Sequence, residues 1–214
     1  MTKLPGPECQ ALSHCTEIFL VRHGQSVHNK QEIIAGQLDS ELAEQGFVDA
    51  RSVAEAIGPQ HFEIVYCSDL RRARQTAEVI VEALRLACPL SFSPFLRELD
   101  YGQYTNRPVS EAFHFLNYKI AQDQRYPGGE SFQDLKKRVA LFLDQLRIEA
   151  KGKRVLIVAH AGSIRMLLML LDEAHAQEYL GQTFGNRYVG RIVLGSGGEP
   201  VSYEVIQDGR SESV

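Results

Sequence analysis

The chain has 214 residues, of which 44% are hydrophobic and 23% charged, with a formal net charge of -4. This length predicts one domain spanning 1–214. The acidic balance argues against a nucleic-acid partner. The lack of any run of about 18 apolar residues argues against a membrane partner. The four cysteines show no CxxC spacing, so we expect reduced thiols in a cytoplasmic protein.

The first elements in the chain are a tail and a buried strand. Residues 1–15 contain a Pro-Gly-Pro run and no apolar core of a signal peptide, so we expect a flexible tail. Ile18–Val21 is a continuous apolar run that predicts a buried strand. The chain then leaves the sheet through Arg22 and His23 into a turn that Gly24 permits. This turn would present His23 at the carboxyl edge of a sheet, where ligands bind in α/β proteins.

The next segment predicts two βα units. Helical spacing over Glu41–Ile57 precedes an apolar run at Phe62–Cys67, which we interpret as the second strand. We expect Ser68 and Asp69 to cap the following helix. A third, short strand is predicted at Pro89–Phe95.

Residues 103–131 are the least regular stretch and mix aromatic with polar residues. We expect a small helical cover that sets specificity. Ser131 should cap a helix that ends at Gly152. The run from Pro127 to Ser131 is open to a second interpretation, in which it is only a turn and a helix cap.

The last elements complete the sheet. Val155–Ala159 predicts a buried parallel strand, followed by His160 and a helix. Tyr188–Leu194 and Val201–Ile206 predict a hairpin, and these strands are candidates for pairing across a homodimer. The whole pattern predicts an α/β fold, namely a three-layer α/β/α sandwich with a mostly parallel central sheet, helices on both faces and a small helical cover.

Four predicted strands are each followed by residues suited to phosphate chemistry: Arg22 with His23, Arg72, Glu98 and His160. Each of them alone also fits a structural role, as a capping arginine, a solvated glutamate or a core histidine. Parallel strands would bring all four positions to one edge of the sheet. A local concentration of arginine in an acidic chain further indicates a cationic pocket for an anionic small molecule.

The chain resembles the histidine phosphatase family, which includes the cofactor-dependent phosphoglycerate mutases, from Ile18 to about Ile206. The segments that carry the resemblance are Leu20–Gly24, Ser68–Ala77, Leu96–Glu98 and Val158–Gly162. Pro127–Ser131 is similar to a loop of alpha-ribazole phosphatases and broad-specificity relatives. The resemblance implies a phosphohistidine mechanism with no metal and no other cofactor.

The resemblance also assigns roles that suit phosphoryl transfer. His23 would be the nucleophile, with one ring nitrogen unprotonated and the other held by a backbone carbonyl. Arg22 and Arg72 would bind phosphate oxygens, and His160 would be a further ligand, most useful when protonated. Glu98 would be the general acid and must then carry a proton, although an ion pair with one of the arginines is the alternative.

Two further residues are predicted to bind the substrate, and two positions depart from the family pattern. Asn29 would donate its side-chain amide to phosphate, and Gly36 would contribute a backbone contact. Ala35 stands where relatives often carry Thr or Gln, and Ala161 replaces a common glycine, so a narrower pocket floor is expected.

His160 follows Glu98 by only 62 positions, a shorter segment than the one with which related mutases enclose a bisphosphate. The spacing therefore favours a phosphatase acting on a small phosphate monoester, such as a sugar phosphate or a nucleoside-like phosphate, alpha-ribazole phosphate among them. A phosphoglycerate mutase-type transfer is the alternative. A non-catalytic module that binds phosphorylated ligands is a third hypothesis.

Overall fold

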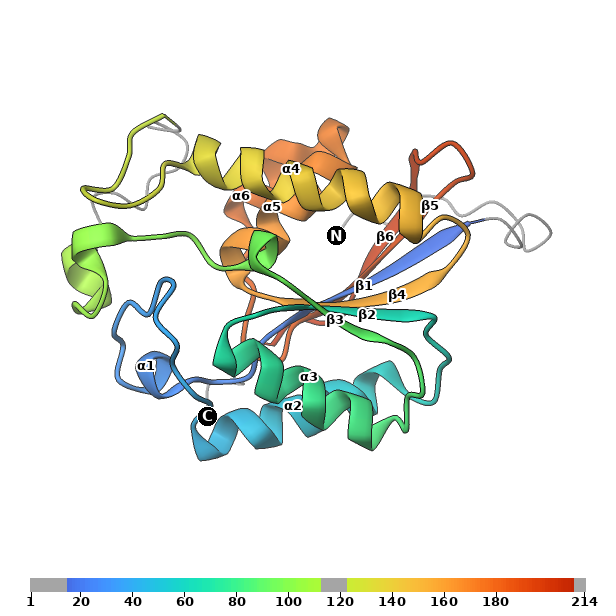
Figure 1. Cartoon of the computed structure of the whole chain (residues 1–214), viewed down its shortest axis with the longest axis horizontal. Helices are drawn as coiled ribbons and strands as arrows, with labels where there is room; N and C mark the ends of the chain where they lie inside the picture. Colours follow the sequence, from blue (N-terminus) through green and yellow to red (C-terminus); the bar gives the residue numbers. More distant parts are fainter. Residues whose placement is uncertain (1–14, 113–122, 210–214) are drawn as a thin grey trace.

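The computed structural model describes residues 15–112 and 123–209. A six-stranded sheet with the order β3-β2-β4-β1-β5-β6 runs through its centre (Figure 1). The strands are β1 (Thr16–Arg22), β2 (Ile64–Ser68), β3 (Leu90–Ser93), β4 (Arg154–Ala159), β5 (Val189–Leu194) and β6 (Pro200–Gln207). The first four are mutually parallel, and β5 and β6 are antiparallel to their neighbours. The predicted mostly parallel sheet is therefore confirmed, and so is the final hairpin.

Helices cover both faces of this sheet. They are α1 (Val27–Lys30), α2 (Glu44–Ile57), α3 (Arg71–Ala83), α4 (Phe132–Glu149), α5 (Ala161–Leu171) and α6 (Ala176–Gly181). In Figure 1, α2 and α3 lie below the sheet, whereas α4, α5 and α6 lie above it. The predicted three-layer α/β/α sandwich is confirmed.

The residues of β1 explain why its sequence is apolar without interruption. Ile18 and Leu20 join the core cluster that includes α4 and α5, whereas Phe19 and Val21 join the cluster that includes α2 and α3. All four are at most 1% exposed. Successive side chains of a strand point to opposite faces, so a strand with helices on both faces needs apolar residues at every position.

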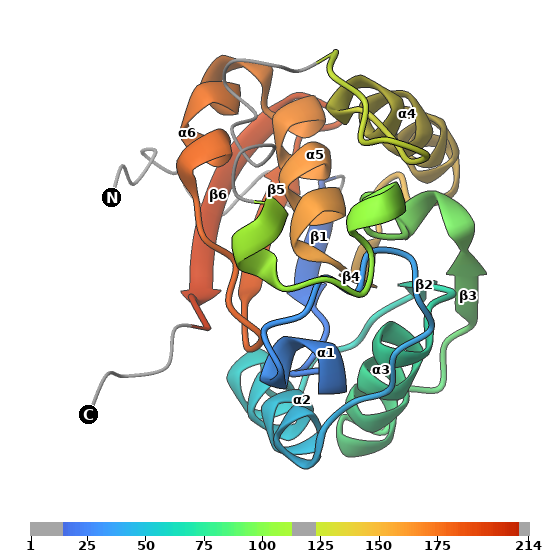
Figure 2. The same cartoon turned by 90° about the vertical axis from the view of Figure 1, so that its left-hand side faces the viewer.

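The register of β1 against β4 places two of the predicted site segments side by side. Arg22 pairs with Ala159, and the N–H of His23 donates to the carbonyl oxygen of Ala159 at 3.0 Å. His23 and His160 therefore leave the sheet from adjacent strand ends. Figure 2 looks onto this edge and shows α1 and the segments after β3 grouped around it.

The predicted cap of α3 is wrong. The helix begins at Arg71 after Leu70, which makes no side-chain capping bond. Ser68 still belongs to β2, and its hydroxyl bonds His160. The carboxylate of Asp69 instead accepts two hydrogen bonds from Arg97. The hydroxyl of Ser68 also accepts from the N–H of Leu70 at 3.4 Å, but neither side chain caps an N–H of the helix itself.

Other expected boundaries shift by a few residues. α2 begins at Glu44 rather than Glu41, because residue 42 forms a bridge with Ser26 before the helix starts. α4 ends at Glu149, and Gly152 lies in the turn beyond it with φ of 69°. The predicted cap by Ser131 is confirmed, since its side chain accepts from the N–H of Asp134 in a capping box.

The described part of the predicted cover contains two short 3-10 helices, Gly102–Tyr104 and Val109–Ala112, and is otherwise turns and irregular chain. The rings of Tyr104 and Tyr126 meet edge to face, with centroids 6.0 Å apart. Residues 113–122 of the cover and residues 1–14 of the predicted tail lie outside the described residues. No helix within the described ranges is both long and apolar enough to span a membrane.

The topology limits how the last two strands could serve a homodimer. β5 pairs with β1 on one side and with β6 on the other. Of these two strands only β6 stands at an edge of the described sheet, and β3 forms the opposite edge. Homodimer formation stays a prediction, and pairing through the last two strands would have to use β6.

Candidate active site

His23 is buried at the end of β1, and its hydrogen bonds define its tautomer. Its Nδ1 lies 2.8 Å from the carbonyl oxygen of Gly24, and the Nε–H of Arg72 donates to its Nε2 at 3.2 Å. An arginine Nε–H can only donate, so Nε2 carries no proton and Nδ1–H donates to Gly24. Burial, followed by the charges of Arg72 and Arg22, lowers the pKa of His23 well below its ordinary value. The ring therefore presents an unprotonated Nε2.

Arg72 extends from the first turn of α3 and is 1% exposed. Its Nη1 donates to the carbonyl oxygen of Leu38 at 2.8 Å, and its Nη2 donates to that of Gly36 at 2.7 Å. Burial lowers the pKa of Arg72 to about 10, so it stays charged at neutral pH. Three of its N–H groups are thus occupied by protein, which leaves two for an anion.

Arg22 is the second cation at this edge. Its Nη1 donates to the carbonyl oxygen of Phe184. Among the described residues, its buried Nε has no hydrogen-bond partner. Burial lowers the pKa of Arg22, and Glu98 opposes this effect. An N–H without a partner on a buried cation is a group that an anion would satisfy.

His160 caps α5 beside His23, with the two ring centroids 5.0 Å apart. Its Nε2 lies 2.8 Å from the hydroxyl of Ser68, and its buried Nδ1 has no partner within the described residues. Burial, followed by the charges of Arg72 and other cationic neighbours, lowers the pKa of His160 well below its ordinary value. The protonated form predicted from the sequence is therefore disfavoured, because the ring is buried and cations surround it.

Glu98 faces the amino end of α5. Its Oε1 accepts from the N–H of Leu99 at 2.8 Å and from that of Gly162 at 3.1 Å. The backbone passes so close that a Cβ added at Gly162 would lie 2.1 Å from Oε1. Within the described residues Glu98 forms no ion pair, so the alternative that pairs it with an arginine is not observed.

The two residues predicted to bind the substrate, Asn29 and Gly36, both accept hydrogen bonds from the protein. Asn29 does so through its side-chain carbonyl, and Gly36 through its backbone carbonyl. Oδ1 of Asn29 accepts from the N–H of Ser26 and from Nδ2 of Asn186, both at 3.2 Å. The NH2 group, which is the predicted donor to phosphate, takes part in neither of these bonds. Gly36 has φ of 50°, and its carbonyl oxygen accepts from Arg72. Ala35 is buried and Ala161 half-buried.

Three residues that support the site were not identified from the sequence in these roles. Ser68 bonds His160, as described above. The hydroxyl of Thr76 accepts from the N–H of Gly24 at 3.0 Å and donates to the carbonyl oxygen of Arg72 at 2.7 Å. Asn186 donates to the carbonyl oxygen of His23 at 3.0 Å. Ser68 and Thr76 lie in a motif that the resemblance marks, whereas Asn186 lies in none.

The two buried imidazoles predict a pH dependence of stability. Their pKa values are lowered from 6.5 in the folded state, so below pH 6.5 the unfolded chain binds more protons. The free energy of unfolding should fall from pH 6.5 to pH 5 by up to about 2.7 kcal/mol per pH unit, about 1.4 for each ring. Urea denaturation in phosphate-free buffer measures this slope.

Single variants separate the contributions to that slope. His160→Asn should reduce it by about half. His175→Asn should leave it unchanged below pH 6.5, because Asp172 raises the pKa of His175 and moves its effect above this range. A wild-type slope near zero would contradict the neutral, buried state of both rings.

A pocket of about 440 Å³ adjoins the segment that carries Glu98. Its lining residues are Gln37, Leu38, Asp100, Gly102, Gln103, Thr105 and Gly128. Gln37 connects it to the site, since its Nε2 donates to the carbonyl oxygen of Glu98 at 3.2 Å. Across residues 15–112 and 123–209, no three His, Cys, Asp or Glu side chains group as a metal site would require.

The sequence profile of the histidine phosphatase superfamily, branch 1, matches residues 18–203. A 2,3-bisphosphoglycerate-dependent phosphoglycerate mutase of Parvibaculum lavamentivorans is 31% identical over 203 residues, which cover 90% of this chain and 91% of the relative. A Schizosaccharomyces pombe protein named as a phosphatase is 31% identical over 170 residues, covering 78% of this chain and 77% of the relative. The structure of the alpha-ribazole phosphatase from Shigella flexneri is similar with a TM-score of 0.78 at 21% identity, covering 92% and 100% of the two chains. The relatives' names thus divide between phosphatase and mutase.

Proposed function

This chain belongs to branch 1 of the histidine phosphatase superfamily, and from that premise we propose that it is a phosphomonoesterase with His23 as its nucleophile. One observation carries the proposal. Nε2 of His23 is held unprotonated, because Nδ1–H donates to Gly24 and Nε–H of Arg72 donates to Nε2. A neutral imidazole with a fixed tautomer is the form that can attack phosphorus.

The proposed reaction has two steps. In the first, the Nε–H of Arg72 releases Nε2 of His23, the Nε2 lone pair attacks the phosphorus, the bond to the leaving oxygen breaks, and protonated Glu98 gives that oxygen its proton. In the second, water attacks phosphohistidine, the P–N bond breaks, and the Glu98 carboxylate accepts a proton from the water. Arg22, Arg72 and His160 stabilise charge on the phosphoryl oxygens in both steps, a role that needs no metal.

The pocket beside Glu98 supports a substrate whose leaving group is polar. Its side chains Gln37, Asp100, Gln103 and Thr105 offer both hydrogen-bond donors and acceptors. Hydroxyl groups of a sugar or of a nucleoside-like group match that lining. We therefore propose that the substrate is a sugar phosphate or a nucleoside-like phosphate monoester, with alpha-ribazole phosphate as one candidate. We also propose a cytoplasmic location, which the absence of CxxC spacing among the cysteines supports.

A mutase is the second candidate function. It is favoured by the similarity to the Parvibaculum lavamentivorans mutase, which extends over nine-tenths of both chains. The short segment between Glu98 and His160 favours the phosphatase instead. A mutase should need a bisphosphate primer and should release little net phosphate, whereas a non-catalytic module should bind phosphate esters without turnover.

The test is phosphate release from a panel of phosphate monoesters in the presence of EDTA. We expect the wild type to release phosphate at an unchanged rate after EDTA treatment, with a sugar or nucleoside-like ester as the best substrate. Loss of release on chelation would contradict metal-independent chemistry. No release from any ester, together with primer-dependent transfer between phosphoglycerates, would establish the mutase instead.

A further inference from the structure

Glu98 lies on a segment that has no regular secondary structure of its own. Residues 97–101, which we call the Glu98 segment, lie between the 3-10 helices Pro94–Leu96 and Gly102–Tyr104 and are irregular. Neither a helix nor a sheet ladder therefore fixes the backbone that carries the Glu98 carboxyl. Its position must come from tertiary hydrogen bonds.

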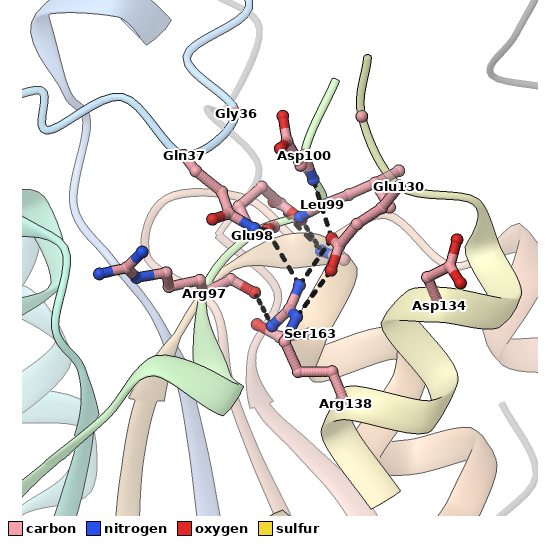
Figure 3. Close-up of polar contacts among 12 residues, drawn as sticks. Gly36, Gln37, Arg97, Glu98, Leu99, Asp100, Glu130, Asp134, Arg138 and Ser163 are labelled. Atoms are coloured by element: carbon pink, nitrogen blue, oxygen red, sulfur yellow. Dashed lines mark hydrogen bonds and ion pairs between the residues drawn. The ribbon is translucent and has the colours of Figure 1, made fainter. Parts of the chain in front are cut away.

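Arg138 supplies most of these bonds from the second turn of α4. It uses all five of its N–H groups, and Figure 3 shows Arg138 between Glu130 and the backbone of Arg97 and Glu98. Two of these N–H groups bind the carboxylate of Glu130: Nε donates to Oε1 and Nη2 to Oε2, each at 2.9 Å. The other three bind backbone carbonyl oxygens. Nη1 donates to those of Phe95 at 2.8 Å and Arg97 at 2.9 Å, and Nη2 donates to that of Glu98 at 3.2 Å. One guanidinium thus binds the backbone carbonyls of Arg97 and Glu98 in the Glu98 segment and that of Phe95 in the 3-10 helix just before it.

Glu130 completes this arrangement from the other side. Its carboxylate pairs with Arg138 in the bidentate geometry, with the two side chains only 18% and 16% exposed. Oε2 of Glu130 also accepts from the N–H of Asp100 at 3.0 Å, and the N–H of Glu130 donates to the carbonyl oxygen of Asp100 at 2.9 Å. The Glu98 segment is therefore fixed on both sides of Glu98.

We propose that Arg138 and Glu130 are positioning residues that aim the Glu98 carboxyl at the leaving oxygen. Neither side chain makes a described hydrogen bond to the phosphate residues, so the positioning effect passes through the backbone of the Glu98 segment. The charge of Arg138 also helps to lower the pKa of His160, and Arg138→Lys keeps that charge. This inference rests on the proposed function, in which Glu98 protonates the leaving group. It also gives Glu130, within the run from Pro127 to Ser131, a role beyond the turn and helix cap.

The proposal predicts a selective loss of acid catalysis. In Arg138→Lys, three ammonium donors replace five fixed N–H groups, so at least two bonds are lost. We compare kcat/KM, which reports transfer to His23 and excludes the later hydrolysis step that both esters share. For an alkyl phosphate kcat/KM should fall at least about 10-fold, part of the usual contribution of a general acid. For p-nitrophenyl phosphate, whose leaving group departs without a proton, kcat/KM should stay within about 3-fold. Glu130→Gln should show the same pattern.

Arg147→Lys is the matched control, because Arg147 lies on the same helix, is exposed and pairs only with Asp144 among the described residues. It should leave both substrates unaffected. Melting temperatures of all variants test their folding. An equal fall in kcat/KM for both substrates would contradict the positioning role, and so would no fall for either.

Amide hydrogen exchange gives a readout that does not depend on activity. The N–H groups of Leu99 and Gly162 are the donors to the Glu98 carboxylate. In Arg138→Lys they should exchange at least about 10-fold faster, while amides in the middle of α4 keep their rates. Unchanged exchange at both amides would overturn the inference. If the wild type hydrolyses neither ester, the proposed function fails, and the exchange result alone still decides the positioning.

Discussion

His23→Asn should reduce phosphate release by at least about 10⁴-fold, because it removes the atom that forms the bond to phosphorus. The same substitution should abolish an acid-labile, alkali-stable phosphoryl group on the protein after a brief reaction with labelled substrate. Both the fall in phosphate release and the loss of the phosphoryl label are expected because Arg72 and Gly24 keep Nε2 of His23 unprotonated. Quenched-flow labelling and steady-state phosphate release measure them.

The control for this prediction is His175→Asn. His175 lies outside the site and bonds Asp172, so its loss should leave phosphate release unchanged. His160 provides the critical alternative, since it is also buried and has a lowered pKa. If His23→Asn kept release within 10-fold of the wild type while His160→Asn abolished the phosphoryl label, the nucleophile would be His160.

Glu98→Gln should divide substrates by their leaving groups. The amide oxygen can still accept from the N–H groups of Leu99 and Gly162, which preserves the local structure, but the amide cannot deliver a proton. We expect kcat/KM for alkyl phosphates, which reports transfer to His23, to fall about 10²- to 10⁴-fold, the range for a lost general acid. p-Nitrophenyl phosphate should lose far less. Steady-state kinetics on the two classes measures the difference.

Glu41→Gln is the matched control, because Glu41 is exposed and pairs with Arg71 at the surface. It should change neither class of substrate. A similar loss on both classes in Glu98→Gln would show that the carboxyl acts on binding or on structure rather than on the leaving group. Retention of the phosphoryl label in Glu98→Gln would separate it further from His23→Asn.

The fold was largely predictable because its central strands are buried on both faces. Ile18–Val21 and Val155–Ala159 are continuous apolar runs, and both lie within parallel strands of the sheet. The side-chain capping signal at Ser131 was equally direct, since the hydroxyl and the third helical residue form a local capping box. Local rules succeed where the partners of a residue are its own sequence neighbours.

The same rules failed at Ser68 and Asp69 for an identifiable reason. Both residue types are good helix caps, but Ser68 is occupied by His160 and Asp69 by Arg97. These partners lie far along the chain. A hydroxyl or carboxylate has the same local propensity in either setting, so the sequence carries no sign of which partner it takes.

The sequence by itself determined the layers of the fold and the edge of the sheet at which His23, Arg72, Glu98 and His160 would collect, because apolar runs and parallel connections impose both. The tertiary structure alone decided their chemical states. The tautomer of His23, the lowered pKa of His160 and the five bonds of Arg138 depend on burial and on donors from distant elements. Hydrogen bonds and desolvation act over a few ångströms in space, and only the packed fold sets those distances.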